Sequence, residues 1–385
     1  MTEWKEYKLG EIADVQTGPF GSQLHMSDYQ DEGTPIITVE HLGDNRIIHN
    51  NLPLVGEKDK NRLKKYVLAE GDIVFSRVGS VDRRAYVSAN EDGWMFSGRC
   101  LRVRPTQEVD SKFLSYYFGL EDFKETIRRI AVGATMPSIN TTILSNVVIP
   151  LPPIDTQQRI ASILSSLDDK IDLLHRENKT LEAMAETLFR QWFIEEAKED
   201  WEEGKLGDEF EFTMGQSPNG DSFNEDGIGF PMYQGNADFG FRFPTRRVFT
   251  TQPTRFAEIN DTLISVRAPV GAQNMATEKC CIGRGVAAFR YKHNHDFYSY
   301  TYYKLKSLLA EIKQYNDNGT VFGSISKSDF ENIDIVIPDI NTIQHFQEQV
   351  KPIDDKIINN NYEIQTLIQT RDNLLPKLMS GEVKI

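Results

Sequence analysis

The side chains of this sequence that could do chemistry are mostly arginines and amides in loops that follow short apolar runs. Arg77 follows Ile73-Val74-Phe75, and Arg267 follows Leu263-Ile264-Ser265-Val266. Arginine can pair with the edge of guanine through two hydrogen bonds, and glutamine or asparagine can pair with adenine in the same way. Lysines and further arginines in such loops can position phosphates. The candidate nucleic-acid contacts are Lys64, Lys65, Arg77, Arg83, Arg84, Arg99, Arg242, Arg246, Arg247, Arg267, Gln273, Asn274 and Arg284.

Each of these side chains, taken singly, is also explained as a solvated surface group. The two loops that carry several of these residues indicate nucleic-acid binding more strongly when each loop is considered as a whole. The loop at 77–84 and the loop at 266–274 differ in sequence, whereas the segments that flank them are alike. A variable loop on a retained frame is typical of binding sites, because connecting segments tolerate change.

Motifs for catalysis are missing from the sequence. It contains no G-x-x-x-x-G-K-[ST] phosphate loop, no G-x-G-x-x-G dinucleotide turn and no Asn/Asp-Pro-Pro-aromatic run for amino-group methylation. His293 and His295 lack a cluster of further ligands, so we interpret them as surface residues. Cys100, Cys280 and Cys281 are too few for a disulfide framework, and we expect them to be reduced. The sequence therefore predicts no catalytic residue, no metal site and no cofactor bound by this chain.

Length and charge restrict the function further. A chain of 385 residues predicts two or three domains. The net charge is −14, and acidic residues outnumber basic ones in each of the segments 1–152, 153–200, 201–338 and 339–385. This argues against a protein that coats nucleic acid without regard to sequence, because such affinity comes from basic residues. No apolar stretch is long enough for a membrane span, and we expect a cytoplasmic protein.

The chain repeats itself. Residues 131–193 align without a gap onto 317–379, with identities that include Gly133/Gly319 and the shared run Asp-Asp-Lys-Ile at 168–171 and 354–357. The beginnings of the copies also match, at Trp4 and Trp201. The second half is therefore a diverged copy of the first.

Each copy is predicted to hold an α+β domain followed by one long helix. Strands are expected at 36–39, 72–75 and 101–103, with counterparts at 262–266 and 286–289, and amphipathic helices at 111–130 and 297–315. The predicted boundaries are 1–152 for the first domain, 153–199 for the first helical region, 200–338 for the second domain and 339–385 for the second helical region.

The helical regions carry apolar residues that alternate spacings of four and three, which predicts a coiled coil about 65 Å long at about 1.5 Å per residue. Two asparagines interrupt the seam, Asn178 at an a position and Asn360 at a d position. Antiparallel helices related by a pseudo-twofold axis place a opposite d, so we hypothesise that this pair fixes the register. A wet seam at each asparagine is the alternative. The residues predicted to pair the helices are Asn178, Asn360, Leu167, Ile171, Ile353 and Ile357.

Several stretches together resemble the DNA-specificity subunits of type I restriction-modification systems. They include Thr17-Gly18-Pro19-Phe20-Gly21-Ser22, Gly71-Asp72-Ile73-Val74-Phe75-Ser76-Arg77, Leu151-Pro152-Pro153-Ile154 and Leu374-Leu375-Pro376-Lys377-Leu378. Each pattern is weak, but their order and repetition are specific, and the resemblance covers the whole chain.

The resemblance implies two target-recognition domains that each read one half of a bipartite double-stranded DNA target, with the helices as a spacer between the halves. It also implies that the helices dock two methyltransferase subunits and that restriction subunits join this assembly. S-adenosylmethionine, ATP and Mg would belong to those partners, and this chain would be non-catalytic.

Other classes remain open from the sequence. One is the specificity subunit of another methylation-based defence system, which a neighbouring gene would reveal. Another is a scaffold whose two domains bind proteins, which absence of any protein–DNA crosslink would favour. An enzyme with an unrecognised active site has the least support.

Overall fold

The computed structural model describes residues 4–19, 23–315, 323–383 and 385. Phe20, Gly21 and Ser22 of the family-like motif and Gly319 of the repeat lie outside the described residues. The chain forms two compact units, which we call unit 1 (Met1–Asp172 with Gln365–Ile385) and unit 2 (Leu173–Ile364). Each unit takes part of both long helices, so the units divide within the helices rather than at their ends. The domain boundaries expected from the sequence stay predictions.

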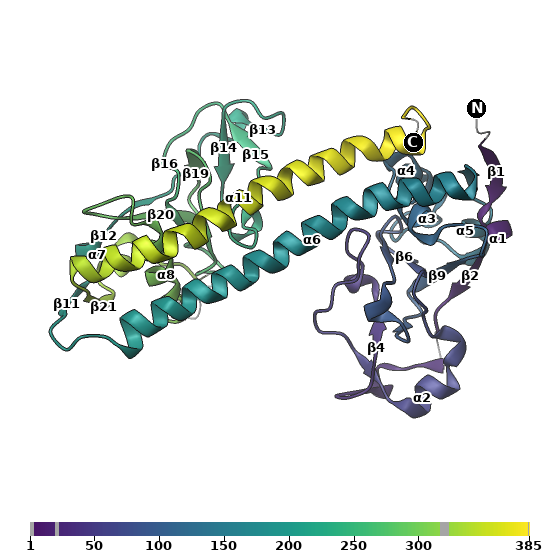
Figure 1. Ribbon diagram of the computed structural model, residues 1–385, viewed down its shortest axis with the longest axis horizontal. Coiled ribbons are helices and arrows are strands. Elements are labelled where there is room, and N and C mark those ends of the chain that lie inside the picture. The colour runs from purple at the N-terminus through teal and green to yellow at the C-terminus, as the bar shows by residue number, and fades with distance from the viewer. Residues whose placement is uncertain (1–3, 20–22, 316–322, 384) are drawn as a thin grey trace. The chain divides into compact units, whose positions relative to one another are not determined.

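Unit 1 is built on three groups of strands (Figure 1). A four-stranded antiparallel sheet has the order β2 (Ala13–Thr17), β9 (Cys100–Pro105), β6 (Ile73–Ser76) and β7 (Arg84–Tyr86). A second sheet has the order β3 (Tyr29–Gln30), β5 (Leu54–Val55), β4 (Thr34–Ile37) and β8 (Met95–Phe96), with β4 and β8 parallel. The third group is the antiparallel pair β1 (Lys5–Lys8) and β10 (Val148–Leu151).

The continuous apolar sequence of β6 has a direct cause. Ile73 and Phe75 point into one buried cluster and Val74 into another, because successive side chains of a strand face opposite sides of the sheet. A strand that is covered on both faces reads as an unbroken apolar run instead of alternating with polar residues. The strands expected near 36–39, 72–75 and 101–103 are therefore present, each shifted by one or two residues.

Unit 2 repeats this arrangement. Its antiparallel sheet has the order β12 (Phe210–Met214), β20 (Val286–Tyr291), β17 (Thr262–Ser265) and β18 (Gln273–Met275). Its second sheet has the order β13 (Phe223–Asn224), β15 (Val248–Thr250), β14 (Phe230–Tyr233), β19 (Cys280–Ile282) and β16 (Phe256–Ala257). The pair β11 (Glu202–Lys205) and β21 (Asp334–Ile337) corresponds to β1 and β10. The duplication expected from the sequence is therefore also a duplication of fold.

The amphipathic helices expected at 111–130 and 297–315 are each two helices, and the prediction of single helices is wrong. The first segment forms α3 (Ser111–Tyr117) and α4 (Glu121–Ile130), and the second forms α8 (Tyr298–Ser307) and α9 (Leu309–Gln314). The first break falls at Gly119, where a Cβ atom would collide with the buried guanidinium of Arg84. Apolar spacing shows which side is buried, and two short helices that share a buried side produce the same pattern.

Each unit also contains short α-helices. They are α1 (Leu9–Ile12), α2 (Glu57–Arg62) and α5 (Thr141–Ser145) in unit 1, and α7 (Leu206–Glu209) and α10 (Lys327–Glu331) in unit 2.

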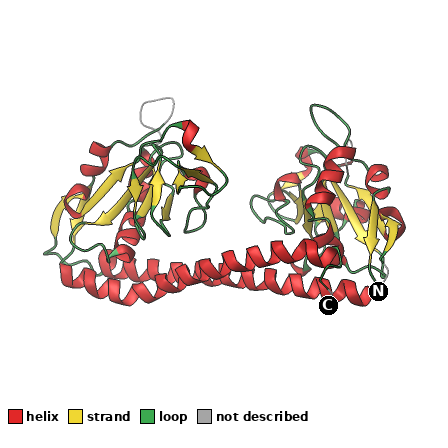
Figure 2. Ribbon diagram, turned by 90° about the horizontal axis from the view of Figure 1, so that it is seen from above, coloured by secondary structure: helices red, strands yellow, loops and turns green. Residues whose placement is uncertain are grey.

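The two long helices are α6 (Ile154–Arg190), which continues as a π-helical turn at Gln191–Glu195, and α11 (Ile340–Met379). In each unit they run antiparallel, and the sheets of that unit lie against them (Figure 2). In unit 1, Arg371 of α11 pairs with Asp168 of α6, and in unit 2 Asn360 pairs with Asn178. Every predicted seam residue, including Leu167, is buried or half-buried. The predicted coiled-coil seam is therefore confirmed within each unit.

The two seam asparagines face each other. The side-chain nitrogen of Asn360 donates hydrogen bonds to Oδ1 of Asn178 at 2.8 Å and to Oε2 of Glu177 at 2.9 Å. Both asparagines are buried, at 3% and 1% exposed. Burying an amide that keeps a hydrogen-bond partner costs less free energy than burying an unpaired one, so the contact favours this alignment of the helices. The facing pair is confirmed, and its role in fixing the register stays a prediction.

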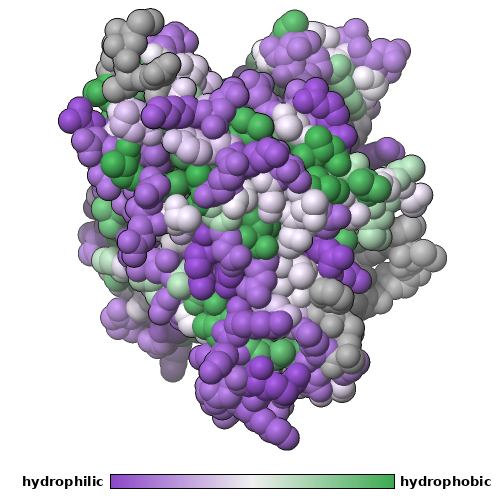
Figure 3. Space-filling model, turned by 90° about the vertical axis from the view of Figure 1, so that its right-hand side faces the viewer, coloured by the Kyte–Doolittle hydropathy of each residue, from purple (hydrophilic) through white to green (hydrophobic). Residues whose placement is uncertain are grey.

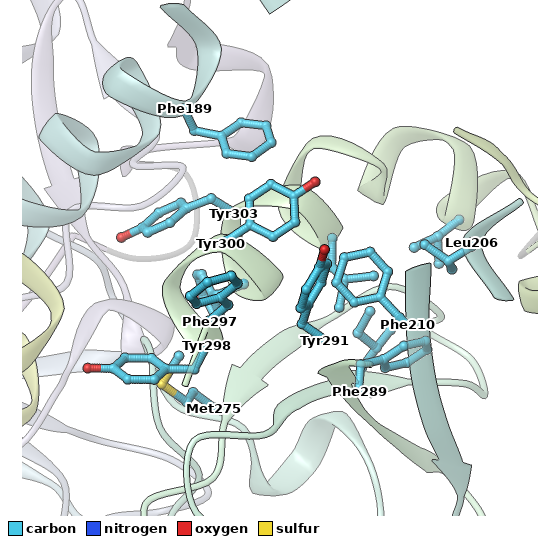
Figure 4. Close-up of a cluster of buried hydrophobic side chains, with 14 of the residues drawn as sticks. Phe189, Leu206, Phe210, Met275, Phe289, Tyr291, Phe297, Tyr298, Tyr300 and Tyr303 are labelled. Carbon is cyan, nitrogen blue, oxygen red and sulfur yellow. The ribbon is translucent and has the colours of Figure 1, made fainter. Parts of the chain in front are cut away.

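The core of unit 2 includes the helices. Phe189 of α6 lies 5.6 Å from Phe346 of α11 and 6.2 Å from Tyr300 of α8, measured between ring centroids. Figure 4 shows Tyr300, Phe297 and Phe189 gathered in this cluster with side chains from the sheet. The domain and its part of the helix pair therefore share one hydrophobic core.

Candidate nucleic-acid interface

Four loops of unit 2 surround a hollow of about 470 Å³, which we call the arginine pocket. Its lining residues are Met232, Gln234, Gly235, Asn236, Ala237, Asp238, Arg247, Val248, Arg267, Ala268, Pro269, Arg284 and Gly285. Three of the arginines singled out in the sequence, Arg247, Arg267 and Arg284, meet here although they are far apart along the chain. Their contact with DNA stays a prediction.

Backbone hydrogen bonds hold the loops of the pocket together. The N–H of Val266 donates to the carbonyl of Gly285 at 2.9 Å, and the N–H of Gly283 donates to the carbonyl of Tyr233 at 2.9 Å. Gly285 has to be glycine, because a Cβ atom there would collide with the carbonyl of Gln234. The pocket therefore rests on a rigid backbone frame, which is what accurate placement of long arginine side chains requires.

The three arginines differ in their surroundings. Arg247 donates to Oδ1 of Asp238 at 2.8 Å, and this nearby carboxylate raises the pKa of the Arg247 guanidinium. Arg267 and Arg284 are exposed, and within residues 23–315 and 323–383 neither guanidinium has an ionic partner. Two cations beside a concave surface attract an anionic ligand, and a guanidinium can bond a phosphate or a base edge with two prongs.

The sequence analysis missed two amide side chains of the pocket, Gln234 and Asn236. Gln234 follows β14 directly and Asn236 comes two residues later, much as Arg267 comes shortly after β17. The available signal was the pair Gln234 and Asn236, separated by one glycine, after the apolar residues Met232-Tyr233. Amides at this position could recognise adenine, in addition to the recognition of guanine by the arginines.

Unit 1 retains the same frame. The N–H of Arg77 donates to the carbonyl of Arg99 at 2.8 Å, and Nη1 of Arg77 donates to the carbonyl of Gly98 at 3.2 Å. Arg83 is exposed and its guanidinium donates to the carbonyl of Leu42. The structure thus brings Arg77 and Arg99 side by side, as it does the loops of Arg267 and Arg284.

The two lysines of unit 1 that were predicted to contact phosphates are accessible. Lys64 and Lys65 lie exposed on a single turn, with the ammonium of Lys65 at 4.8 Å from the ring centre of Tyr66. Arg246 of unit 2 is also exposed and bonds Oε1 of Glu278 at 2.5 Å. Their predicted role in positioning phosphates is compatible with this exposure and stays a prediction.

Two predicted contact residues are buried, which corrects the expectation for them. Arg242 is enclosed between Asp354, with Nη2 to Oδ1 at 2.8 Å, and the ring of Tyr302, whose centre lies 3.3 Å from the guanidinium carbon. Arg84 donates to the carbonyl of Ser115 at 3.0 Å, and burial lowers the pKa of its guanidinium. Neither side chain is the exposed surface cation that was expected, because each is buried and bonded to groups of the protein.

Two predicted amides are also used internally. Asn274 is buried and exchanges hydrogen bonds with the backbone of Gly240, donating at 3.0 Å and accepting at 3.1 Å. Gln273 donates to the carbonyl of Tyr302 at 2.7 Å. Both lie on β18, so a segment expected to be a reading loop is instead a strand of the sheet.

Among the described residues, no group of three or more His, Cys, Asp or Glu side chains could hold a metal ion, and no helix is long and apolar enough to cross a membrane. The cysteines are free and buried, and burial raises the pKa of the Cys100 thiol to about 12. On the face shown in Figure 3, hydrophobic residues form small groups among hydrophilic ones.

Comparison with known proteins identifies a family and several relatives that are similar to this chain. The family described as type I restriction modification DNA specificity domain matches residues 1–183 and 198–370. A protein of Methanocaldococcus jannaschii named "Putative type I restriction enzyme MjaX specificity subunit" is 31% identical, over 100% of this chain and 94% of the relative. The HindI specificity subunit of Haemophilus influenzae is 23% identical, over 100% of both chains.

A solved structure has the same fold. The S subunit of a type I restriction-modification system from M. genitalium aligns with a TM-score of 0.63 at 19% identity, over 98% of this chain and 96% of that one. Since the family pattern covers nearly the whole sequence in two copies, this chain belongs to the family of type I restriction-modification DNA specificity domains.

Proposed function

We propose that this chain is the sequence-specific DNA-recognition subunit of a type I restriction-modification complex. Each domain would read one half of a bipartite target, and the helices would set the gap between the halves. The observation that carries the proposal is the arginine pocket, in which Arg247, Arg267 and Arg284 converge on a domain that the chain contains twice. Arginines on a rigid frame are suited to reading guanine edges in the major groove.

The partners follow from the division of labour in such a complex. Two methyltransferase subunits would dock on the helical regions, and restriction subunits would join them. This chain would be non-catalytic and bind no cofactor, while S-adenosylmethionine, ATP and Mg would be held by the partners. A base must leave the stack to be methylated, and that pocket would belong to the methyltransferase. The whole assembly would work in the cytoplasm on double-stranded DNA.

The test is methylation-sensitive sequencing of host DNA with the gene present, deleted and restored. We expect adenine methylation at a two-part motif with a fixed gap to disappear with the gene and return with it. A chain in which residues 200–338 come from a relative should change only one half of the motif. Methylation that is independent of the gene while its partner is expressed would contradict the proposal.

A further inference from the structure

Arg242 joins the second domain to both long helices of unit 2. Its side chain is 1% exposed, with Nη2 at 2.8 Å from Asp354 on α11 and Nη1 at 3.4 Å from Glu182 on α6. Its guanidinium lies over the ring of Tyr302, and Nη1 bonds the hydroxyl of Tyr303 at 3.2 Å. A single side chain from a domain loop thus meets a carboxylate from each helix.

The loop that carries Arg242 is fastened on its other side to the sheet. The side chain of Asn274 bonds both polar backbone groups of Gly240, and the N–H of Met275 donates to the carbonyl of Arg242 at 2.9 Å. Five residues further along the same loop, Arg247 lines the arginine pocket. A short, hydrogen-bonded path therefore connects the helices to the pocket.

Unit 1 mounts its domain differently. In the repeat Asp168 corresponds to Asp354, and its cation is Arg371 of α11 at 2.8 Å, with the two side chains 26% and 20% exposed. Matching bridges, Leu42–Ile47 in unit 1 and Phe239–Pro244 in unit 2, place Asn45 at the position of Arg242. Asn45 bonds Ser115 of its own domain. The cation on this aspartate therefore comes from a helix in unit 1 and from the domain in unit 2.

We propose that Arg242 is a positioning residue that fixes the second domain on the helix pair and so sets how strictly the complex selects the gap between the half-sites. The proposal rests on the proposed function. A guanidinium held by carboxylates from two helices permits little rotation or sliding, because a buried charge that loses its partner has no water to replace it. An exposed ion pair is weaker and more tolerant of movement, because water screens it.

The test removes the buried charges together. Arg242→Met alone would leave Asp354 buried without a cation, which can unfold the domain. In Arg242→Met/Asp354→Asn the asparagine still accepts from the hydroxyl of Tyr303, and Glu182 keeps Lys306 as its partner at 2.6 Å. Arg242→Lys, which keeps the charge but not the two-pronged geometry, is measured beside it.

A matched control exists within the same domain. Arg290 and Asp261 form an ion pair, with Nε to Oδ1 at 2.9 Å, that joins β20 to the start of β17 without touching either helix. Arg104 and Asp72 form the corresponding pair in unit 1. Arg290→Met/Asp261→Asn therefore removes the same chemical groups from inside the domain.

The readout is methylation by the complete complex on DNAs that share both half-sites and differ by one base pair in the gap. We expect the preference for the native gap to fall at least tenfold in Arg242→Met/Asp354→Asn and partly in Arg242→Lys, and to stay within twofold in the control. A folded double variant, judged by thermal melting, with an unchanged gap preference would overturn the inference. If the native complex methylates no two-part target, the proposed function itself has failed.

Discussion

Arg242 and Arg267 show how much the surroundings of one residue type decide its role. Arg242 is sealed between Asp354 and Tyr302, whereas Arg267 is exposed at the rim of the arginine pocket. Burial lowers the pKa of Arg242, but the neighbouring carboxylates outweigh this effect and the pKa ends above its usual value. The buried arginine thus stays charged and structural, and the exposed one is available to a ligand.

At the same scale, Arg267→Ala should relax the base preference at one position in one half of the target. We expect a cost of about 1 to 3 kcal/mol for the cognate base and little for others. Arg246→Ala is the control, since Arg246 lies outside the pocket lining and should weaken all sequences alike. Binding titrations of the complex against single-base variants measure both. Uniform weakening by Arg267→Ala would show a phosphate contact instead.

We expect the stability of the protein to depend on pH because of Glu209. Burial raises the pKa of its carboxyl to about 7, although Lys304 and the hydroxyl of Tyr300 oppose the shift. The folded state then holds the proton more tightly than the unfolded state, where the pKa is about 4.5, so this contribution to stability is lost as the pH rises from about 4.5 to about 7.

Glu209→Gln removes this titration. Between pH 5 and pH 8 the natural protein should lose about 1 to 3 kcal/mol more unfolding free energy than the variant, since one pKa unit corresponds to about 1.4 kcal/mol. Urea unfolding at the two pH values measures the difference. Glu203→Gln, at an exposed position, should change nothing. Equal pH dependence in both variants would exclude Glu209 as the cause.

At the scale of elements, the helix pair combines apolar packing with one polar contact. The seam of α6 and α11 buries Ile357, Leu174 and their neighbours, which supplies affinity without a unique alignment. The pair Asn178–Asn360 adds a contact that only one alignment satisfies. A single buried polar pair in such a seam selects register at a cost in stability.

Asn178→Leu alone should destabilise unit 2 by about 1 to 3 kcal/mol, because Asn360 would lose a buried partner. Asn178→Leu/Asn360→Leu should recover that loss and admit other registers. Urea unfolding measures the first effect. Disulfide formation between cysteines introduced at Leu181 and Ile357, compared with Leu181 and Ile353, measures the second. A single register in the double variant would refute the assigned role.

At the scale of the whole molecule, the chain is negatively charged although its proposed ligand, DNA, is negatively charged too. The chain carries a net charge of −14, and its exposed cations are local groups such as Arg267 and Arg284. Negative charge over the rest of the chain repels a polyanion and weakens its binding. The partners would then supply many of the phosphate contacts, and the chain alone should bind DNA weakly.

The affinity of the assembled complex should therefore fall steeply with salt. An assembly that neutralises six to ten phosphates loses on the order of 10³ to 10⁵ in affinity between 50 and 200 mM salt. Titrations of the cognate DNA at several salt concentrations give the slope, with the isolated chain measured in parallel. A flat response of the complex would contradict phosphate-clamped binding.

The sequence by itself determined the features that depend on periodicity and repetition. The duplication, the strands near 73–76 and 262–265, the seam of the helices and the facing asparagines all follow from local spacing, because burial of one face imposes a period on the chain. The break near Gly119 escaped this reasoning, since the close approach of the Arg84 guanidinium from β7, which leaves no room for a Cβ atom at Gly119, comes from a segment distant in sequence.

Only the tertiary structure decided which polar residues face solvent. Arg242 meets Glu182 and Asp354, which lie 60 and 112 residues away along the chain, and Arg247, Arg267 and Arg284 come together from separate loops. A charged residue type carries no local signal of burial, because its environment is made by segments distant in sequence. The convergence of the three arginines on the pocket and the burial of Arg242 between the two helices therefore had to come from the fold.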